Sequence, residues 1–340
     1  MTPLLLGLIV IVSKQYNFLL FHTLVELFTV TVAILMSVVV WQTYPFTRNN
    51  FLMYLGCCYF WIGSLDIAHT LIYKGMQIFP YDIANPSVQF WLSARYMEAA
   101  LLLSAPLFLT RRLNRIKAFV IFGISATLLF FLIMTGHFPD GFVEGQGLTA
   151  FKINSEYIII CVLGLSMFYL SRQKKHIEPH VLQLMYASIV LTMCAELAFT
   201  FYVNVYGLSN IVGHVFKLFS YWLIFIAIIR TTLAEPFSVM AREATTYDAI
   251  PAATIVVDEA NIIRQANKQA CLITGKSKDE LVGQSSHQYF HPQSVSTYEC
   301  PICQSVTAFK PIEMLELERP EQNKWFDYTL SAISIDKEKL

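Results

Sequence analysis

Long apolar segments separated by short polar ones run from the N-terminus to Ile229. Seven of these segments come near the ~20 residues that an α-helix needs to cross a bilayer, so each predicts a transmembrane helix. They span Phe18–Trp41, Asn50–Ile72, Ser87–Leu109, Ile116–Thr135, Ile153–Leu170, Val181–Tyr206 and Ser209–Ile229. Pro3–Val12 is also apolar but covers only about half a span, and it lacks the basic start and small-residue cleavage site of a signal peptide. We expect a short N-terminal helix there.

Beyond Ile229 the long apolar segments stop. Ala234–Ala249 is a polar, helix-like stretch that begins with a proline break, and from Ile250 onward short elements alternate with turns. We therefore divide the chain into an integral-membrane domain at 1–233, a helical linker at 234–249 and a small α/β domain at 250–340. The expected fold class is mainly α: a polytopic helical membrane bundle with a C-terminal α/β domain.

The elements of the small domain follow from alternation and from turn residues. Thr254–Asp258 and Ile262–Ala266 predict two strands joined by a tight turn, which together make a β-hairpin. Lys268–Thr274 predicts a helix closed by the glycine that follows it. Further strands are predicted, again from apolar and polar alternation, at Pro311–Glu318 and Trp325–Ile335.

The composition supports a membrane protein and argues against several functions. Hydrophobic residues make up 55% of the chain and charged residues 14%, whereas soluble domains carry about 25% charged residues. The 24 basic and 24 acidic side chains cancel, and there is neither a basic stripe nor a Gly-rich phosphate loop, so no nucleic-acid partner is expected. Kinase and cyclase signatures are also missing, so we expect no enzyme activity in this chain. Seven scattered cysteines do not form the pattern of a secreted disulfide framework.

Basic residues are concentrated in alternate connecting loops, which predicts the orientation in the membrane. Cytoplasmic loops retain Lys and Arg, so the more basic set of loops is expected inside the cell. This set carries Arg48, Arg111, Arg112, Arg115, Lys117, Arg172, Lys174, Lys175 and Arg230. The other set, with Lys14, Lys74 and Lys152, is expected outside, and the chain leaves its last membrane helix on the cytoplasmic side.

Ionisable residues inside the predicted membrane helices lie at a similar depth, in or near the outer half. A charge at this depth costs several kcal/mol, so such side chains usually face the bundle interior, pair with one another or bind a ligand. The residues are His22, Glu26, Asp66, His69, Arg95, Glu98, Glu196, His214 and Lys217. We therefore expect an intramembrane polar pocket near the outer face.

The spacing of these residues favours a metal or a metal-containing cofactor. His22 and Glu26 at i,i+4 share one helix face, as do Asp66 and His69 at i,i+3. The carboxylates of the pocket exceed its cations by two if the histidines are neutral, and a divalent ion would balance them. Imidazole with carboxylate suits Zn, Fe, Mn or Ni, and histidines also serve as axial ligands of haem.

Two other interpretations of the pocket stay open. In a purely structural one, Arg95 and Glu98 form an i,i+3 pair, Lys217 snorkels to the surface, and single histidines make interhelical hydrogen bonds. In the other, the pocket takes a small organic or protonic ligand.

The small domain has a motif of its own, H-x3-H-x8-C-x2-C, formed by His287, His291, Cys300 and Cys303. Two imidazoles and two thiolates meet the donor requirement of a tetrahedral zinc or iron site. The C-x2-C pair alone is also compatible with thiol redox sensing, and an inert structural role is a third alternative.

Five runs of the sequence resemble a known family. FHTLVELFTV, GSLDIAHTLIYKGM, WLSARYMEA, CAELAFTFYVNVYG and GHVFKLFSYWLIFIAI are similar to the membrane-associated sensor domain of the third type (MASE family), a bacterial integral-membrane input module. The resemblance covers about residues 15–233 and includes His22, Glu26, Asp66, His69, Arg95, Glu98, Glu196 and His214. The stretch after Ile250 resembles the start of a PAS domain, which we expect to lack its last strand.

The resemblance implies a multi-pass protein of the bacterial inner membrane with a cytoplasmic C-terminus. Members of this family precede PAS domains, histidine kinases or cyclic-di-GMP enzymes, so a homodimer coupled to a kinase or diguanylate cyclase is expected. Two functions remain: a signalling input protein whose pocket reports a ligand to the PAS-like domain, or a membrane redox or ion and proton transport protein. The appended PAS-like domain favours the first.

Overall fold

The computed structural model describes residues 2–79, 84–200, 207–319 and 324–331. The chain divides into two compact units, Met1–Glu235 and Pro236–Leu340. Each unit is described by itself.

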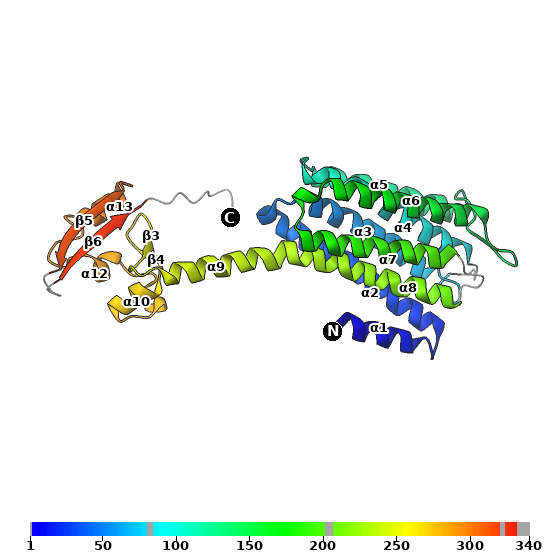
Figure 1. Ribbon diagram of the computed structural model, residues 1–340, viewed down its shortest axis with the longest axis horizontal. Helices are drawn as coiled ribbons and strands as arrows, with labels where there is room; N and C mark the ends of the chain where they lie inside the picture. Colours follow the sequence, from blue (N-terminus) through cyan, green and yellow to red (C-terminus); the bar gives the residue numbers. More distant parts are fainter. Residues whose placement is uncertain (1, 80–83, 201–206, 320–323, 332–340) are drawn as a thin grey trace. The chain divides into compact units, whose positions relative to one another are not determined.

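The first unit is a bundle of α-helices (Figure 1). Seven of them are long and apolar enough to cross a membrane, and a shorter helix precedes them. The helices are α1 (Thr2–Ser13), α2 (Phe18–Thr47), α3 (Asn50–Leu71), α4 (Asn85–Ser104, extended by a 3-10 turn at Ala105–Leu109), α5 (Arg115–Met134), α6 (Ala150–Arg172), α7 (Pro179–Thr200) and α8 (Leu208–Ile229). The predicted spans are thus confirmed in the described part of the chain, although the end of the span predicted at Val181–Tyr206 lies outside the described residues.

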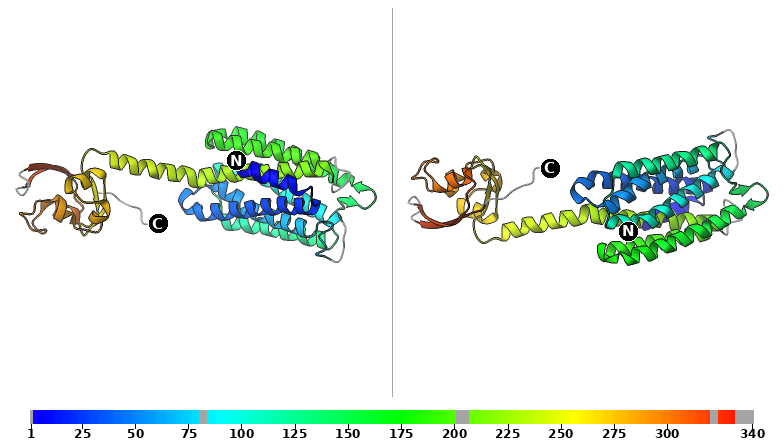
Figure 2. Two further views of the ribbon diagram at one scale, coloured as in Figure 1. Left: turned by 90° about the horizontal axis from the view of Figure 1, so that it is seen from below. Right: turned by 90° about the horizontal axis from the view of Figure 1, so that it is seen from above.

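The centre of the bundle is α3. It packs against α2, α4 and α5, while α8 packs against α2 and α7. The short helix α1 packs against α2 and α8, on the side of the bundle away from α5 (Figures 1 and 2). Between α5 and α6, strands β1 (Phe142–Val143) and β2 (Gly147–Leu148) form a small hairpin.

Polar caps set where the membrane helices begin. Asn17, Asn49, Asn114 and Thr149 stand at the N-caps of α2, α3, α5 and α6, and each side chain accepts a hydrogen bond from a backbone N–H of the first turn. Such caps satisfy donors that would otherwise stay unpaired. Because these caps fix the entry points of the helices, they also fix the depth of the polar residues that follow.

The second unit contains the predicted strands and short helices. Its elements are α9 (Glu235–Ala249), β3 (Ile255–Val257), β4 (Ile263–Ala266), α10 (Lys268–Thr274), α11 (Lys278–Leu281), α12 (Ser286–Phe290), α13 (Pro301–Thr307), β5 (Ile312–Arg319) and β6 (Lys324–Leu330). Strands β3 and β4 pair antiparallel, as do β5 and β6. The predicted β3–β4 hairpin is therefore present, and the two later predicted strands also form a hairpin, while the end of the strand predicted at Trp325–Ile335 lies outside the described residues.

Two residues of this unit show why its elements form where the sequence predicts them. Asp258 ends the first strand, and its carboxylate accepts hydrogen bonds from the backbone N–H groups of Ala260 and Ile262, which shapes the β3–β4 turn. Asn267 is fully buried, caps α10 and accepts a bond from the Thr254 N–H. It thereby ties the hairpin to the helix.

The proline break expected at the start of the linker is not present. A π-helical segment, Arg230–Ala234, follows α8, and α9 begins at Glu235 without an intervening loop. A proline ring clashes with the carbonyl group four residues before it in a regular α-helix, and the wider turn of a π segment relieves that contact. The backbone therefore stays helical through Pro236.

Gly213 on α8 gives a test of the packing between α7 and α8. A Cβ at this position would meet ring carbons of Phe199 at 2.5 Å, and that ring cannot move easily because it packs on Trp91 and His214. We expect Gly213→Ala to lower the thermal midpoint of the detergent-solubilised protein.

Gly164→Ala on α6 is the matched control, because nothing lies within 4 Å of its added Cβ. An alanine in place of a helical glycine stabilises by about 0.5–1 kcal/mol when it fits. An equal response of the two variants in a thermal-shift assay would contradict the close packing at Gly213.

Candidate metal centre and buried ion-pair network

Three histidines and one glutamate converge inside the bundle. His22 and Glu26 come from α2, His69 from α3 and His214 from α8. All of these side chains are buried. One ligand atom from each lies within 4.8 Å of the others, and we call this group the histidine quartet.

The distances within the histidine quartet fit a common metal ion. His22 Nε2 lies 3.2 Å from His69 Nε2, and His214 Nε2 lies 3.3 Å from Glu26 Oε1. Two ligands of a tetrahedral zinc ion, with bonds of about 2.0–2.1 Å, are separated by about 3.3–3.4 Å. Both pairs are therefore spaced as the edges of one coordination tetrahedron.

Backbone carbonyl groups orient two of the imidazoles. His69 Nδ1 lies 2.7 Å from the Ser87 carbonyl oxygen, and His214 Nδ1 lies 2.8 Å from that of Asn210. A carbonyl oxygen can only accept, so each Nδ1 carries a proton, and in the neutral form of the ring Nε2 then has the lone pair that faces the quartet. This arrangement is typical of metal-ligating histidines, whose other nitrogen donates to a carbonyl or carboxylate group.

A small cavity adjoins the quartet. It measures about 30 Å³, and its lining includes His69, Tyr73, Trp91, Asn210 and His214. A cavity of this size has room for a water molecule beside the quartet. Haem, one of the cofactors suggested by the sequence, does not fit, because even drug-sized ligands occupy pockets of about 300 Å³ or more.

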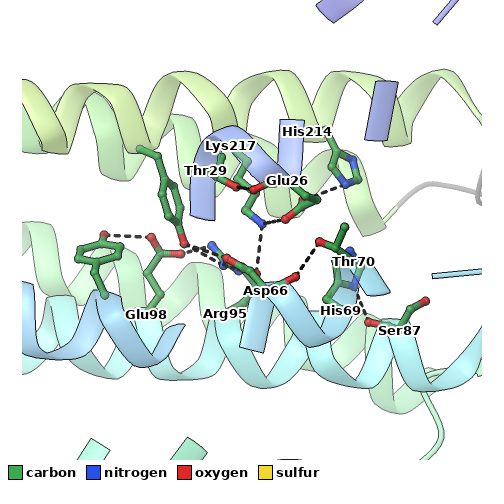
Figure 3. Close-up of polar contacts among 12 residues, drawn as sticks. Glu26, Thr29, Asp66, His69, Thr70, Ser87, Arg95, Glu98, His214 and Lys217 are labelled. Atoms are coloured by element: carbon green, nitrogen blue, oxygen red, sulfur yellow. Dashed lines mark hydrogen bonds and ion pairs between the residues drawn. The ribbon is translucent and has the colours of Figure 1, made fainter. Parts of the chain in front are cut away.

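An ion-pair network continues from the quartet into the bundle (Figure 3). Lys217 Nζ bridges Glu26 Oε2 at 2.7 Å and Asp66 Oδ1 at 3.2 Å. Arg95 then joins Asp66, at 3.0 Å, to Glu98. Four of the residues predicted for the pocket, Asp66, Arg95, Glu98 and Lys217, thus lie beside the quartet as its charge partners and not among its ligand atoms.

Two tyrosines that sequence analysis missed complete this network. Tyr221 donates to Asp66 and accepts from Arg95, and Tyr59 donates to Glu98. Both are fully buried. Their positions in aromatic, apolar stretches of α8 and α3 gave no signal that separates them from ordinary core residues.

Glu196 interacts electrostatically with Arg95 and Glu98 of the predicted pocket and also with a second buried cluster that was not predicted. On α7 it interacts electrostatically with Glu156, which forms an ion pair with Lys152 on α6. Lys152 also donates to the Phe199 carbonyl oxygen at 2.9 Å and is buried. The expectation that Lys152 lies in an outer loop is wrong, because the helix starts at the Thr149 cap and takes this residue inside. Its i,i+4 spacing to Glu156 was the signal that could have identified the pair.

The charges buried in the described part of the first unit do not cancel. Five carboxylates face three cationic side chains, so two negative charges are in excess if every carboxylate is ionised and the histidines are neutral. The groups are Glu26, Asp66, Glu98, Glu156 and Glu196 against Arg95, Lys152 and Lys217. The excess equals the predicted one, although the residues that produce it differ. A divalent cation in the histidine quartet would balance it.

The second unit also brings its predicted residues together. Ligand atoms of His287, His291, Cys300 and Cys303 lie within 4.8 Å of one another. Burial, and then the neighbouring Cys300 thiol, raises the pKa of Cys303 to about 12. A bound metal ion would lower this pKa, because the thiolate is the form that ligates metal.

Comparison with protein families identifies the first unit. The family model of the MASE3 membrane-associated sensor domain matches residues 13–236, well over half of the chain. The chain belongs to the MASE3 family. The matched region contains the histidine quartet, the ion-pair network and the Glu196 cluster. A model of the PAS fold matches residues 244–303. No curated protein and no solved structure matches the chain.

The MASE3 domain followed by a PAS domain makes this chain a multi-pass membrane protein of signal-transduction input type. The family predicted from the five sequence runs is thereby confirmed. The two matched regions are a sensor and a PAS domain, and neither is a catalytic domain.

Asp66 gives a test of the ion-pair network. Asp66→Asn leaves Arg95 and Lys217 without the carboxylate that they share, and breaking a buried ion pair in this way costs about 3–5 kcal/mol. We expect a large fall in the thermal midpoint of the MASE3 protein in detergent. Glu144→Gln, which breaks the exposed pair with Lys74, should change it little, and similar small shifts for both variants would argue against a structural role of the network.

Proposed function

We propose that the histidine quartet of this MASE3 domain binds one divalent metal ion, and that occupancy of this site is the input that the chain reports. The observation that supports the proposal is that two atoms with lone pairs, an imidazole nitrogen and a carboxylate oxygen, point toward each other. His214 Nε2 and Glu26 Oε1 lie 3.3 Å apart in a buried site (Figure 3), and neither makes a hydrogen bond to any third group among the described residues. Buried polar atoms are normally satisfied, and a cation between them would satisfy both.

The donor set restricts the metal. Three imidazoles and one carboxylate suit Zn²⁺, Fe²⁺ or Ni²⁺. The adjoining cavity would let a water molecule or a small anion occupy a further coordination position. The signal would then be the metal itself or a small molecule that coordinates to it.

The helix that carries part of the site also leads to the second unit. His214 and Lys217 lie on α8, and the chain runs from α8 through the π segment into α9. A bound ion would tie His214 on α8 to Glu26 on α2, so the bound and empty states would differ in how firmly α8 is held against α2. A ligand shifts a conformational equilibrium only through such a difference in contacts.

The orientation in the membrane is part of this proposal. The basic loops follow α2, α4, α6 and α8, which favours a cytoplasmic location for them. The quartet would then lie in the outer half of the inner membrane, and the PAS domain would lie in the cytoplasm. A homodimer that acts on a histidine kinase or diguanylate cyclase would complete the pathway.

Proton or ion transport is the second candidate. The close approach of Glu156 and Glu196 favours it, because neighbouring buried carboxylates are common in proton relays. Uptake into liposomes that contain the purified chain separates the two functions. A proton or ion flux that Glu196→Gln abolishes would support transport. If the wild-type chain gives no flux, signalling remains the favoured function.

Removal of one ligand should empty the quartet. Substitution of a residue that only supports a metal ligand typically lowers metal affinity by about 10–100-fold. His69→Ala and His214→Ala each remove a ligand, so we expect each to lower the affinity at least as much. Metal content is measured by elemental analysis of protein purified from membranes without chelators. His137→Ala is the matched control, because His137 is exposed and contacts Thr135 in a loop.

The same proteins test the relay. Hydrogen exchange in α8 and in residues 230–249 should slow when metal is added to the wild type and should not respond in His69→Ala. Wild-type metal content in both alanine variants would refute the site. Metal binding without any change in exchange would refute the relay alone.

The proposed topology predicts which loops a protease can reach in spheroplasts, whose inner membrane is intact and exposed. A protease site inserted at Gly145, in the α5–α6 loop, should be cleaved, since that loop carries few basic residues. The same site inserted between Arg111 and Arg112 should resist cleavage until the spheroplasts are lysed. Cleavage of only the second site in intact spheroplasts would reverse the orientation.

A further inference from the structure

The second unit holds a cluster of four potential metal ligands, and the match to the PAS fold assigns no role to them. His287 belongs to α12 and His291 follows that helix directly. Cys300 is the N-cap of α13 and Cys303 lies in its first turn. Two short helices, separated by a loop, thus present two imidazoles and two thiols to one point.

The distances in this cluster fit tetrahedral zinc. His291 Nδ1 lies 3.2 Å from Cys303 Sγ and 3.6 Å from Cys300 Sγ, and His287 Nδ1 lies 3.5 Å from Cys303 Sγ. With bonds of about 2.0–2.1 Å to nitrogen and about 2.3 Å to sulfur, the nitrogen–sulfur edge of a zinc tetrahedron is about 3.5 Å. A sulfur and a nitrogen from different helices therefore already stand at coordination spacing.

The neighbouring contacts prepare the histidine for such a role. His287 Nε2 lies 3.1 Å from the Val295 carbonyl oxygen, so this nitrogen is the donor and Nδ1 carries the lone pair of a neutral ring. Val295 belongs to the loop between the two helices. The loop thus accepts a hydrogen bond from the imidazole ring that faces the thiols. Metal-bound histidines usually donate such a bond from the nitrogen that does not bind the metal.

The cluster lies in the core of this part of the unit. Cys300 and Cys303 are buried with Ile302 and pack against apolar side chains of β5 and β6. Tyr328 on β6 donates to the Phe290 carbonyl oxygen, which stands next to His291. The apolar cluster around the cysteines is small, and small cores commonly depend on a metal or a cross-link for stability.

We propose that His287, His291, Cys300 and Cys303 bind one Zn²⁺ ion, and that this ion holds α12, α13 and the loop between them against the β5–β6 hairpin. The site is closed: four protein ligands complete a tetrahedron, which is the pattern of structural zinc. The ion would stabilise this part of the PAS region and would not exchange with a signal. The proposal does not depend on metal binding by the histidine quartet.

Cobalt substitution in the full chain tests the site and separates it from the membrane quartet. Thiolate bound to Co²⁺ gives a charge-transfer absorption in the near ultraviolet, and the quartet contains no sulfur. We expect this absorption in the wild type and in His69→Ala, and its loss in Cys300→Ser. Cys271→Ser is the control, because Cys271 lies in the same unit outside the cluster and its loss should leave the absorption unchanged.

Metal content provides the second measurement. Cys300→Ser should lose about one zinc ion per chain, as expected for one closed site. His69→Ala should keep this ion and lose only the metal that the histidine quartet holds. The proposal is overturned if the wild type gives no thiolate–cobalt absorption, or if Cys300→Ser keeps both the absorption and the zinc.

A measurement on the unmodified chain guards against misfolding of the serine variant. Removal of zinc by a chelator should expose Cys300 and Cys303 to alkylation, which mass spectrometry maps, and added zinc should protect them again. The reactivity of Cys271 should stay constant throughout. Equal alkylation of Cys300 and Cys303 with and without zinc, or isolation of the pair as a disulfide in the native protein, would overturn the proposal.

Discussion

The cost of placing charge inside a bilayer governs the arrangement of the MASE3 domain. An isolated charged side chain at that depth is unfavourable by several kcal/mol, so each one needs a partner of opposite charge, and several of these partners lie on another helix. Lys217 on α8 meets carboxylates from α2 and α3, and Arg95 on α4 meets one from α3. These pairs fix which faces of α2, α3, α4 and α8 meet. Apolar packing alone would leave several rotations of each helix nearly equal in energy, since lipid and core are similarly apolar.

The sequence was sufficient to predict the spans and the depth of the polar residues, because both depend on hydropathy and on loop positions. It could not predict which helix faces which. Glu196 was grouped with Glu98 because they share a depth, and the two do interact, but the stronger electrostatic neighbour of Glu196 is Glu156 on α6. Lys152 was assigned to a loop because the apolar run starts one residue later. The depth of a residue in the membrane can be predicted from its own segment alone. Its interaction partners depend on how different segments pack together, which the sequence does not show.

The small domain was predicted in more detail because its signals are local. The turn before Ile262 and the helix ended by Gly275 both depend on neighbouring residues, and each is present in the structure. The π segment before Pro236 could not be predicted. The sequence does not show whether a helix ends before a proline or continues past it through a π-helical turn. The H-x3-H-x8-C-x2-C spacing indicated a set of donors, and only the fold shows that they reach one point.

Glu26 links the candidate metal centre to the ion pairs, because its two oxygens face different groups. Oε1 faces His214, while Oε2 holds Lys217, which also holds Asp66. In the proposed binding mode a metal ion would take negative charge from Glu26, so the interaction of Lys217 would shift toward Asp66, the partner of Arg95. Low-dielectric surroundings strengthen such exchanges between pairs. A single ion near the end of the bundle could therefore alter the contacts of α8 with α2 and α3, without any large movement at the site itself.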